Sequence, residues 1–351
     1  PAVLAAAPAA GAKGRDLVAA LHAGYEVAVR IAAARDFSRL DTLSTGRWGA
    51  YGVTAAAGLL GRDTPQVLAT AFSIAGALSP GLSAAGYSSV MGNQVKEGIP
   101  WAVMTGLTAL ELARQGLTGP ADILDHPDYF NAKAITAGLG SGSVLTAVYF
   151  KPYACCRWLH AAIDAIVELG AGGTVDPGDI LSVDVHTFER ALRLNNHPDP
   201  DTLEGAQYSL PFCLAVAACG GAQALLPLSP VWLHRPEVTS LAARMRLHVD
   251  PVLENRFPAE AGARVSMETT AGHAEVTVRH ALGDPDNPFG RLRLTTKFRR
   301  LAAGVMDPAD QDRLLVAADS LPDLEGAEPI LSCLKRPPAG LGRENHGLLD
   351  P

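Results

Sequence analysis

The stretch 151–160 gathers a lysine, two cysteines, an arginine and a histidine at the start of a predicted amphipathic helix. Lys151 precedes a proline, which favours extended backbone and a fixed starting point for its side chain. Such a lysine can neutralise a carboxylate, or act as a base when it is desolvated. Cys156 and His160 are four positions apart, so on a helix they would share a face with Arg157 beside them. We expect Lys151, Cys156 and His160 to be catalytic and Arg157 to bind substrate. The alternative is a surface lysine, core cysteines and a solvated histidine.

Further polar positions in predicted loops could bind an anionic substrate. Thr45 lies in a run of hydroxyls and glycines before a predicted helix, and Lys96 precedes a helix start, where backbone N–H groups favour anions. Asn196 and His197 form a polar loop ahead of Tyr208. We expect these five residues to bind substrate, although each could also belong to an ordinary polar loop.

The cofactor signatures that we sought are missing from the sequence. It has no G-x-G-x-x-G after a strand, no phosphate-binding G-x-x-x-x-G-K-[ST], no H-E-x-x-H and no G-x-S-x-G. No C-x-x-C pair suggests zinc, and five cysteines, two of them adjacent, do not form a disulfide framework. We therefore expect no metal, no organic cofactor and a reducing, cytoplasmic location.

The composition limits the possible partners. The chain has 351 residues, which favours two domains, and its 48% hydrophobic and 19% charged content is that of a soluble globular protein. A formal charge of −7 without a basic stripe argues against nucleic acid. No apolar run is long enough to span a bilayer, so we expect no membrane partner.

The hydrophobic pattern predicts helices first and a mixed region afterwards. Residues 1 to about 145 read as successive helices, with starts near Asp16, at Thr64-Pro65 and at Pro100. The pattern then changes. It predicts a helix over 157–169, a strand over 180–186, a helix near 202–219 kinked at Pro211, a hairpin of 263–268 with 274–279, and helices over 291–303 and from Asp307-Pro308.

These elements predict a two-domain fold, an all-α helical domain and an α+β domain. The helical domain would comprise residues 1–148, with 299–351 returning to it, and the α+β domain residues 149–298. Pro1 has no initiator methionine or signal peptide before it, so we expect the numbered chain to lack an N-terminal portion.

In their order and spacing, several motifs resemble the MmgE/PrpD family, which includes 2-methylcitrate dehydratase, cis-aconitate decarboxylase and iminodisuccinate epimerase. The likeness covers nearly the whole chain. The matching stretches are 24–27, 44–49, Lys96 with Gly106, 116–124, 151–160, 204–211, 283–288 and Lys297-Phe298. The resemblance implies a helical domain, an α+β lid, an active site between them and no organic cofactor. With the many small apolar positions of the first 145 residues, it also implies a homodimer through the helical domain.

The resemblance also bears on single residues. It implies a catalytic or carboxylate-binding role for Lys151 and a second cation at Lys96, and it matches His160 to the histidine that ends the family's motif. Cys156 stands where many members have histidine, Leu43 replaces a common histidine, and Leu194 stands where decarboxylase-like members have tyrosine.

We therefore expect a cofactor-independent lyase or isomerase that removes a proton next to a carboxylate of a small di- or tricarboxylic acid. A dehydratase-like lyase is the first expectation. An epimerase, a decarboxylase or a non-catalytic carboxylate-binding relative are the alternatives.

Overall fold

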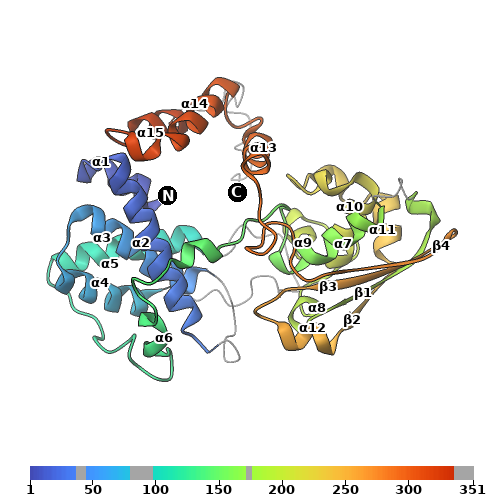
Figure 1. The fold of residues 1–351 in the computed structure, drawn as a ribbon, viewed down its shortest axis with the longest axis horizontal. Helices are drawn as coiled ribbons and strands as arrows, with labels where there is room; N and C mark the ends of the chain where they lie inside the picture. The colour runs from blue at the N-terminus through green and yellow to red at the C-terminus, as the bar shows by residue number, and fades with distance from the viewer. Residues whose placement is uncertain (37–44, 80–97, 171–175, 336–351) are drawn as a thin grey trace, which may run out of the picture. The chain divides into compact units, whose positions relative to one another are not determined.

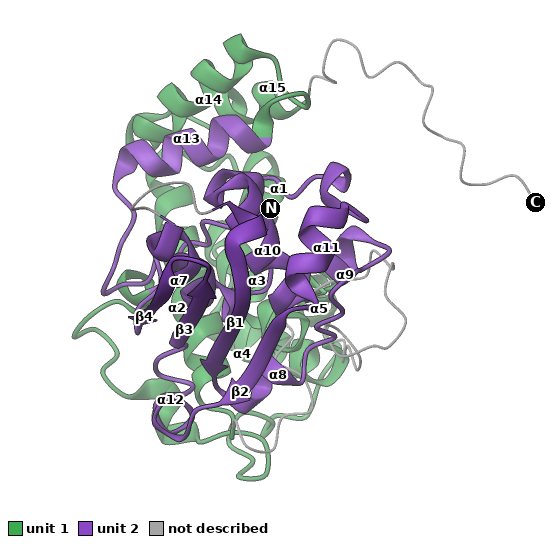
Figure 2. Ribbon diagram, turned by 90° about the vertical axis from the view of Figure 1, so that its right-hand side faces the viewer, with its two compact units in different colours: residues 1–85, 95–147, 302–351 green, residues 86–94, 148–301 purple. Residues whose placement is uncertain are grey.

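The computed structural model describes residues 1–36, 45–79, 98–170 and 176–335. These residues fall into two compact units, coloured separately in Figure 2. The helical unit comprises residues 1–85, 95–147 and 302–351, and the α+β unit comprises residues 86–94 and 148–301. The two-domain fold, one part helical and the other α+β, is therefore confirmed.

The helical unit is built on a layer of close-packed helices (Figure 1). Their bounds are α1 (Ala2–Ala10), α2 (Gly14–Ala33), α3 (Gly46–Gly61), α4 (Pro65–Leu78), α5 (Ile99–Arg114), α6 (Ala132–Thr136), α14 (Pro308–Asp319) and α15 (Glu328–Leu334), with short 3₁₀ turns at Val144–Ala147 and Leu321–Asp323. α3 packs against α1, α2, α4 and α5, so it is the central helix of the unit.

Small residues allow the central helices to approach closely. A Cβ added to Gly52 of α3 would lie 2.5 Å from the carbonyl oxygen of Gly24 in α2. On another side of α3, the buried Thr54 hydroxyl donates within 3.0 Å to Ala50 and 3.2 Å to Gly106 of α5. The alanine and glycine content of this region therefore sets the spacing between its helices.

The last described helices complete the core of the helical unit. The backbone N–H of Gly14 donates a 2.7 Å hydrogen bond to Leu324, and Lys13 forms a 2.6 Å ion pair with Glu325. Ala327 belongs to the same buried cluster as Leu17 at the start of α2. Residues more than 300 positions apart thus share one core.

The α+β unit contains a four-stranded mixed sheet in the order β2-β1-β3-β4. The strands are β1 (Ile180–Thr187), β2 (Met245–Val249), β3 (Ala263–Thr269) and β4 (Gly272–Val278). β1 pairs parallel with β2 and antiparallel with β3, and β3 and β4 form the hairpin that alternation predicted. Val183 and Val185 of β1 are fully buried, which agrees with the predicted half-buried strand.

Helices complete the α+β unit. They are α7 (His160–Gly170), α8 (Glu189–Leu192), α9 (Leu203–Gln207), α10 (Leu210–Gly220), α11 (Pro236–Ala242), α12 (Pro251–Arg256) and α13 (Arg291–Ala302), with 3₁₀ turns at Arg157–Leu159, Pro177–Asp179, Ala222–Ala224 and Pro230–Trp232. α7, α10 and α11 lie over one face of the sheet (Figure 1), and α7 packs on β3 and β4.

The prediction of a single helix near 202–219 is wrong. The structure has two helices, and Pro211 lies in the first turn of α10 after the cap at Ser209, whose side chain accepts from Phe212. A proline is tolerated there because the first turn leaves backbone N–H groups without an intrahelical partner. Pro211 therefore starts a helix and does not kink one.

Candidate active site

The backbone that carries Lys151 is anchored within the α+β unit. Phe150 donates a 2.9 Å backbone hydrogen bond to Gly283, and the rings of Phe150 and Phe289 stack with centroids 6.5 Å apart. Gly283 has φ +93°, and a Cβ there would lie 1.9 Å from the carbonyl oxygen of Phe150. Only glycine fits this contact, so Lys151 extends from a closely restrained backbone.

Lys151 has no ion pair and no side-chain hydrogen bond with the residues that the structure describes, and it is half-buried. A second lysine, Lys297 of α13, is also half-buried and likewise unpaired within those residues. Burial lowers the pKa of Lys297, and the charge of Lys151 nearby lowers this pKa further. Two ammonium groups are thus held close together, an arrangement that an anion between them would stabilise.

α13 adds another cation at this place. Arg293 lies one helical turn before Lys297, and its charge is close enough to Tyr153 to bear on the ionisation of that phenol. Sequence reasoning did not select Lys297 or Arg293 as site residues. The i, i+4 basic spacing on one helix was visible, but the approach of α13 to Lys151 depends on tertiary structure.

Arg157 forms an ion pair with Asp284, and its guanidinium lies 4.8 Å from the centroid of the Tyr149 ring. The side chain is 11% exposed, and its buried NH1 group has no hydrogen-bond partner in the described part of the chain. Because a guanidinium has five N–H donors, Arg157 keeps donor capacity for an acceptor from a ligand.

His160 begins α7 and is fully buried. Neither of its ring nitrogens has a hydrogen-bond partner among the described residues, and its ring centroid lies 5.1 Å from that of Tyr153. Buried polar groups without partners are uncommon in native structures, and functional sites are among the places where they occur. His160 is therefore the most unusual of the predicted catalytic residues.

The thiol that interacts with His160 belongs to Cys155, which is 1% exposed. Burial raises the pKa of this thiol, but Cys213 and His160 beside it outweigh that effect, so the pKa lies below its usual value. Cys156 and His160 do not share a helix face, although their spacing had suggested it. Cys156 precedes the 3₁₀ turn Arg157–Leu159 with extended backbone, so the i, i+4 relationship does not hold.

Cys156 is half-buried at the junction of two segments. Its backbone N–H donates a 2.8 Å hydrogen bond to Gln207, next to Tyr208. The structure therefore brings the 151–160 segment beside the loop that holds Asn196 and Tyr208, since Asn196 donates its own backbone N–H to Tyr208 at 3.2 Å. This much of the predicted site is assembled within one unit.

The polar groups of this loop are largely used to hold it. The Asn196 amide donates to Ala191 and Leu192 at 3.0 and 3.1 Å and accepts from Leu210 at 2.9 Å. Tyr208 is 4% exposed, and the exposed His197 is hydrogen-bonded to Asp199 at 2.8 Å. These contacts explain the loop's shape, and the substrate-binding roles of Asn196, His197 and Tyr208 stay predictions.

Two predicted substrate-binding residues belong to the helical unit's range. Thr45 precedes α3 as its N-cap, its carbonyl accepts from Trp48 and Gly49, and its side chain caps no backbone group. Lys96 lies outside the described residues. The binding roles of both stay predictions.

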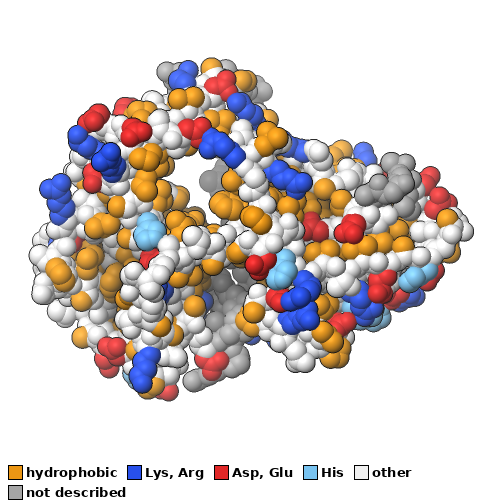
Figure 3. Space-filling model, viewed as in Figure 1, with side chains coloured by type: hydrophobic (Ala, Val, Ile, Leu, Met, Phe, Trp, Pro, Cys, Tyr) orange, Lys and Arg blue, Asp and Glu red, His pale blue; other side chains and the backbone are white. Residues whose placement is uncertain are grey.

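Within the described ranges, no group of three or more His, Cys, Asp or Glu side chains is arranged to hold a metal ion. No described helix is long and apolar enough to cross a membrane. On the face shown in Figure 3, basic and acidic side chains are interspersed.

The fold and the site define the class of protein to which the chain belongs. It has a helical unit and an α+β unit, and lysines of the α+β unit lie near a buried thiol and a buried imidazole. Comparison with known proteins assigns the family. The chain belongs to the MmgE/PrpD family, because the family's N-terminal domain matches residues 1–138 and its C-terminal domain matches residues 153–323.

The curated relatives have a low sequence identity to this chain. Two sequences named cis-aconitate decarboxylase, one from Aspergillus terreus and one from Aspergillus terreus strain NIH 2624 / FGSC A1156, are each 26% identical to this chain over 379 aligned residues. Each alignment covers 96% of this chain and 76% of the relative.

Proposed function

We propose that this protein is a cofactor-independent lyase or isomerase, dehydratase-like in its first step, that removes a proton next to a carboxylate of a small di- or tricarboxylic acid. One observation carries the proposal. Lys151 and Lys297 lie together without an ion-pair partner among the described residues, and one of them has a lowered pKa. A substrate carboxylate would supply the missing negative charge, and membership of the MmgE/PrpD family supports this substrate class.

The residues divide the work as follows. The Lys151 ammonium neutralises a substrate carboxylate, and the spare donor of Arg157 holds another oxygen. Lys297 is a candidate base, because burial and Lys151 lower its pKa and so ease the loss of its proton. Cys156 lines the site. The buried side chains of His160 and Cys155 lie beneath the site and determine the charge there.

The base takes the proton and leaves a carbanion-like centre stabilised by the cations. In dehydration, the neighbouring hydroxyl then leaves with a proton as water. In epimerisation, a proton returns to the opposite face.

Decarboxylation is the second candidate function, favoured by the names of the two Aspergillus relatives. In that reaction the carbon–carbon bond to a carboxylate breaks, carbon dioxide leaves, and the carbon that keeps the electron pair takes up a proton. Leu194, where decarboxylase-like members have tyrosine, is 5% exposed in the hydrophobic core of the α+β unit, which weighs against this alternative. The third candidate is a non-catalytic protein that binds carboxylates.

Proton NMR in D₂O separates these functions. The full chain is incubated with 2-methylcitrate, cis-aconitate and iminodisuccinate in turn. We expect deuterium to enter the position next to a carboxylate of at least one of them, with loss of water in the dehydratase case and release of carbon dioxide in the decarboxylase case. Lys151→Ala should abolish the exchange, and Lys133→Ala, at an exposed lysine of α6, should not. Binding without any exchange would show a non-catalytic relative.

A further inference from the structure

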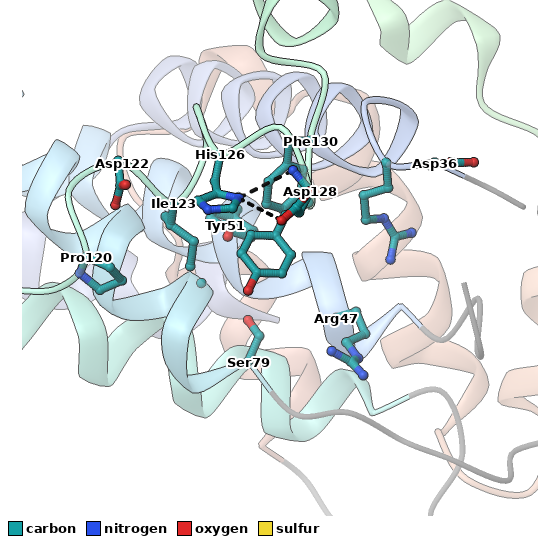
Figure 4. Close-up of a pocket in the computed structure, with 13 residues that line it drawn as sticks. Asp36, Arg47, Tyr51, Ser79, Pro120, Asp122, Ile123, His126, Asp128 and Phe130 are labelled. Carbon is teal, nitrogen blue, oxygen red and sulfur yellow. Dashed lines mark hydrogen bonds and ion pairs between the residues drawn. The ribbon is translucent and has the colours of Figure 1, made fainter. Parts of the chain in front are cut away.

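A cavity of about 620 Å³ lies within the helical unit, and none of the residues given a role above lines it. Its walls come from the residues after α2, the start of α3, the end of α4 and the loop over 120–130 (Figure 4). This volume is in the range of small-molecule sites. The proposed function assigns nothing to it.

Two guanidinium groups line this cavity, those of Arg35 and Arg47. Neither forms an ion pair with a carboxylate among the residues that the structure describes. Arg35 is half-buried, and its Nε donates to Ala32 at 3.2 Å, which leaves its terminal nitrogens without a described partner. Burial lowers the pKa of Arg35, and the charge of Arg47 lowers it further. The two charges therefore repel each other, and no described carboxylate forms an ion pair with either.

A buried tyrosine supplies a neutral donor. Tyr51 is 2% exposed, lines the cavity, and its hydroxyl makes no hydrogen bond with the described residues. Burial raises the pKa of Tyr51 to about 12, so its hydroxyl keeps its proton at neutral pH. Gly76 makes room for it, since a Cβ at Gly76 would lie 2.2 Å from the Tyr51 oxygen. The phenol can therefore donate to an acceptor bound in the cavity.

Acidic and aromatic side chains also line the cavity. Asp122 and Arg47 lie on opposite sides in Figure 4, and Asp36 points away from the other labelled side chains. His126 accepts from the Asp128 backbone at 3.3 Å, and its ring centroid lies 4.9 Å from that of Tyr129. The cavity therefore combines guanidinium, aromatic and carboxylate side chains.

We propose that this cavity binds a small organic acid, with its carboxylate on Arg35, Arg47 and Tyr51. The planar guanidinium groups can hold carboxylate oxygens in pairs, and the Tyr51 hydroxyl adds a third donor. The carbon body packs against the rings of His126 and Tyr129.

Isothermal titration calorimetry of the full chain tests this proposal with succinate and, separately, inorganic phosphate. We expect succinate to bind, and Arg35→Gln and Arg47→Gln each to weaken its binding at least about tenfold, as for loss of a charge-assisted hydrogen bond. Arg15→Gln is the matched control. Arg15 is exposed at the other end of α2, and its substitution removes the same single positive charge. Tyr51→Phe should weaken binding less than either arginine variant.

Several outcomes would overturn the proposal. They are no detectable succinate binding, unchanged binding in both arginine variants, or an equal loss in Arg15→Gln. Tighter binding of phosphate than of succinate would refute the carboxylate assignment. Loss of binding in Lys151→Ala but not in Arg35→Gln would place the acid at the lysine site, which refutes this inference and leaves the proposed function standing. Arg47 is exposed, so its variant should fold even if Arg35→Gln does not.

Discussion

The hydroxyl of Tyr153 donates a 2.5 Å hydrogen bond to Oδ1 of Asp164, whose Oδ2 accepts from the backbone of Leu282 at 2.6 Å. One carboxylate of α7 thus fixes both the segment that carries Lys151 and the loop before α13, which carries Lys297. Burial is the main cause that raises the pKa of Tyr153, so the phenol remains a donor over the physiological range. The relative position of the two lysines depends on this bridge.

Lys151→Ala should lower kcat/KM at least about 100-fold, or roughly 2.7 kcal/mol, as for a preorganised electrostatic contact. Steady-state kinetics on the substrate found by deuterium exchange provide the measurement. Lys133→Ala should stay near wild type, and Cys156→Ser should be intermediate. If Lys151→Ala kept near-normal turnover and Cys156→Ser were inactive, the central catalytic role would belong to the Cys156 thiol and not to Lys151.

Lys297 should react with an amine-directed reagent at lower pH than an exposed lysine does, because burial and Lys151 lower its pKa and so enlarge its neutral fraction. The pH dependence of labelling at each lysine can be read by mass spectrometry, with Lys133 as the exposed control. Lys151→Ala removes a positive charge, so the labelling curve of Lys297 should shift to higher pH. A curve that does not move would show that the two lysines are not coupled.

Asp184 should make stability depend on pH. Its carboxylate accepts from Arg246 at 2.8 Å and contacts His248 at 2.6 Å, and the hydrogen bond from Arg246 is the main cause that holds its pKa well below the usual value. The stabilisation is therefore present above the ordinary pKa of an aspartate and lost as pH falls toward the folded-state value. Urea unfolding should show Asp184→Asn destabilised at pH 7, with a smaller difference near pH 3. Asp201→Asn, at a side chain 93% exposed, should show no such trend.

Gly52→Ala should destabilise the helical unit by about 1–3 kcal/mol, the usual cost of overpacking. The added methyl would lie 2.5 Å from the Gly24 carbonyl oxygen and 2.8 Å from Cβ of Ala28, so α2 and α3 would have to separate. Thermal and urea unfolding measure the change. Gly326→Ala is the control, since nothing lies within 4 Å of its added Cβ. Equal stability of both variants would contradict the tight contact between these helices.

We propose that the protein is a homodimer formed through the helical unit. Val18, Leu21 and Tyr25 follow one face of α2 and are 40–45% exposed in the single chain. Sedimentation at micromolar concentration should give a species of twice the chain mass, and Leu21→Glu should shift it toward the monomer. Leu181→Glu, at a leucine of β1 that is 56% exposed, should not. A monomeric wild-type chain would refute the proposal.

The fold was largely predictable because local patterns carry it. The alternation over 180–186 and the paired runs around Ala271 gave β1 and the β3–β4 hairpin, and the cap-and-proline signal at Thr64-Pro65 gave the start of α4. The prediction failed at Pro211, where a proline is compatible with either a kink or a first turn. The cap at Ser209, which decides between them, is a side-chain hydrogen bond that periodicity does not reveal.

The candidate site was predictable only in part. Lys151, Arg157 and His160 were selected by residue type within one short segment. The spacing of Cys156 and His160 suggested that they could share a helix face, but the backbone at Cys156 is extended. Lys297 is far from Lys151 along the chain, so no local pattern could indicate that their charges interact.

The return of α14 and α15 to the helical unit has a consequence for the order of synthesis. Ala327, which closes the cluster around Leu17, leaves the ribosome only after the whole sheet of the α+β unit has been made. The nascent helices α1 to α5 must therefore wait with part of their apolar surface uncovered while some 210 further residues, from Arg114 to Ala327, are translated. Chaperone dependence during translation, and sensitivity to truncation before α15, should accordingly exceed what the stability of the finished protein suggests.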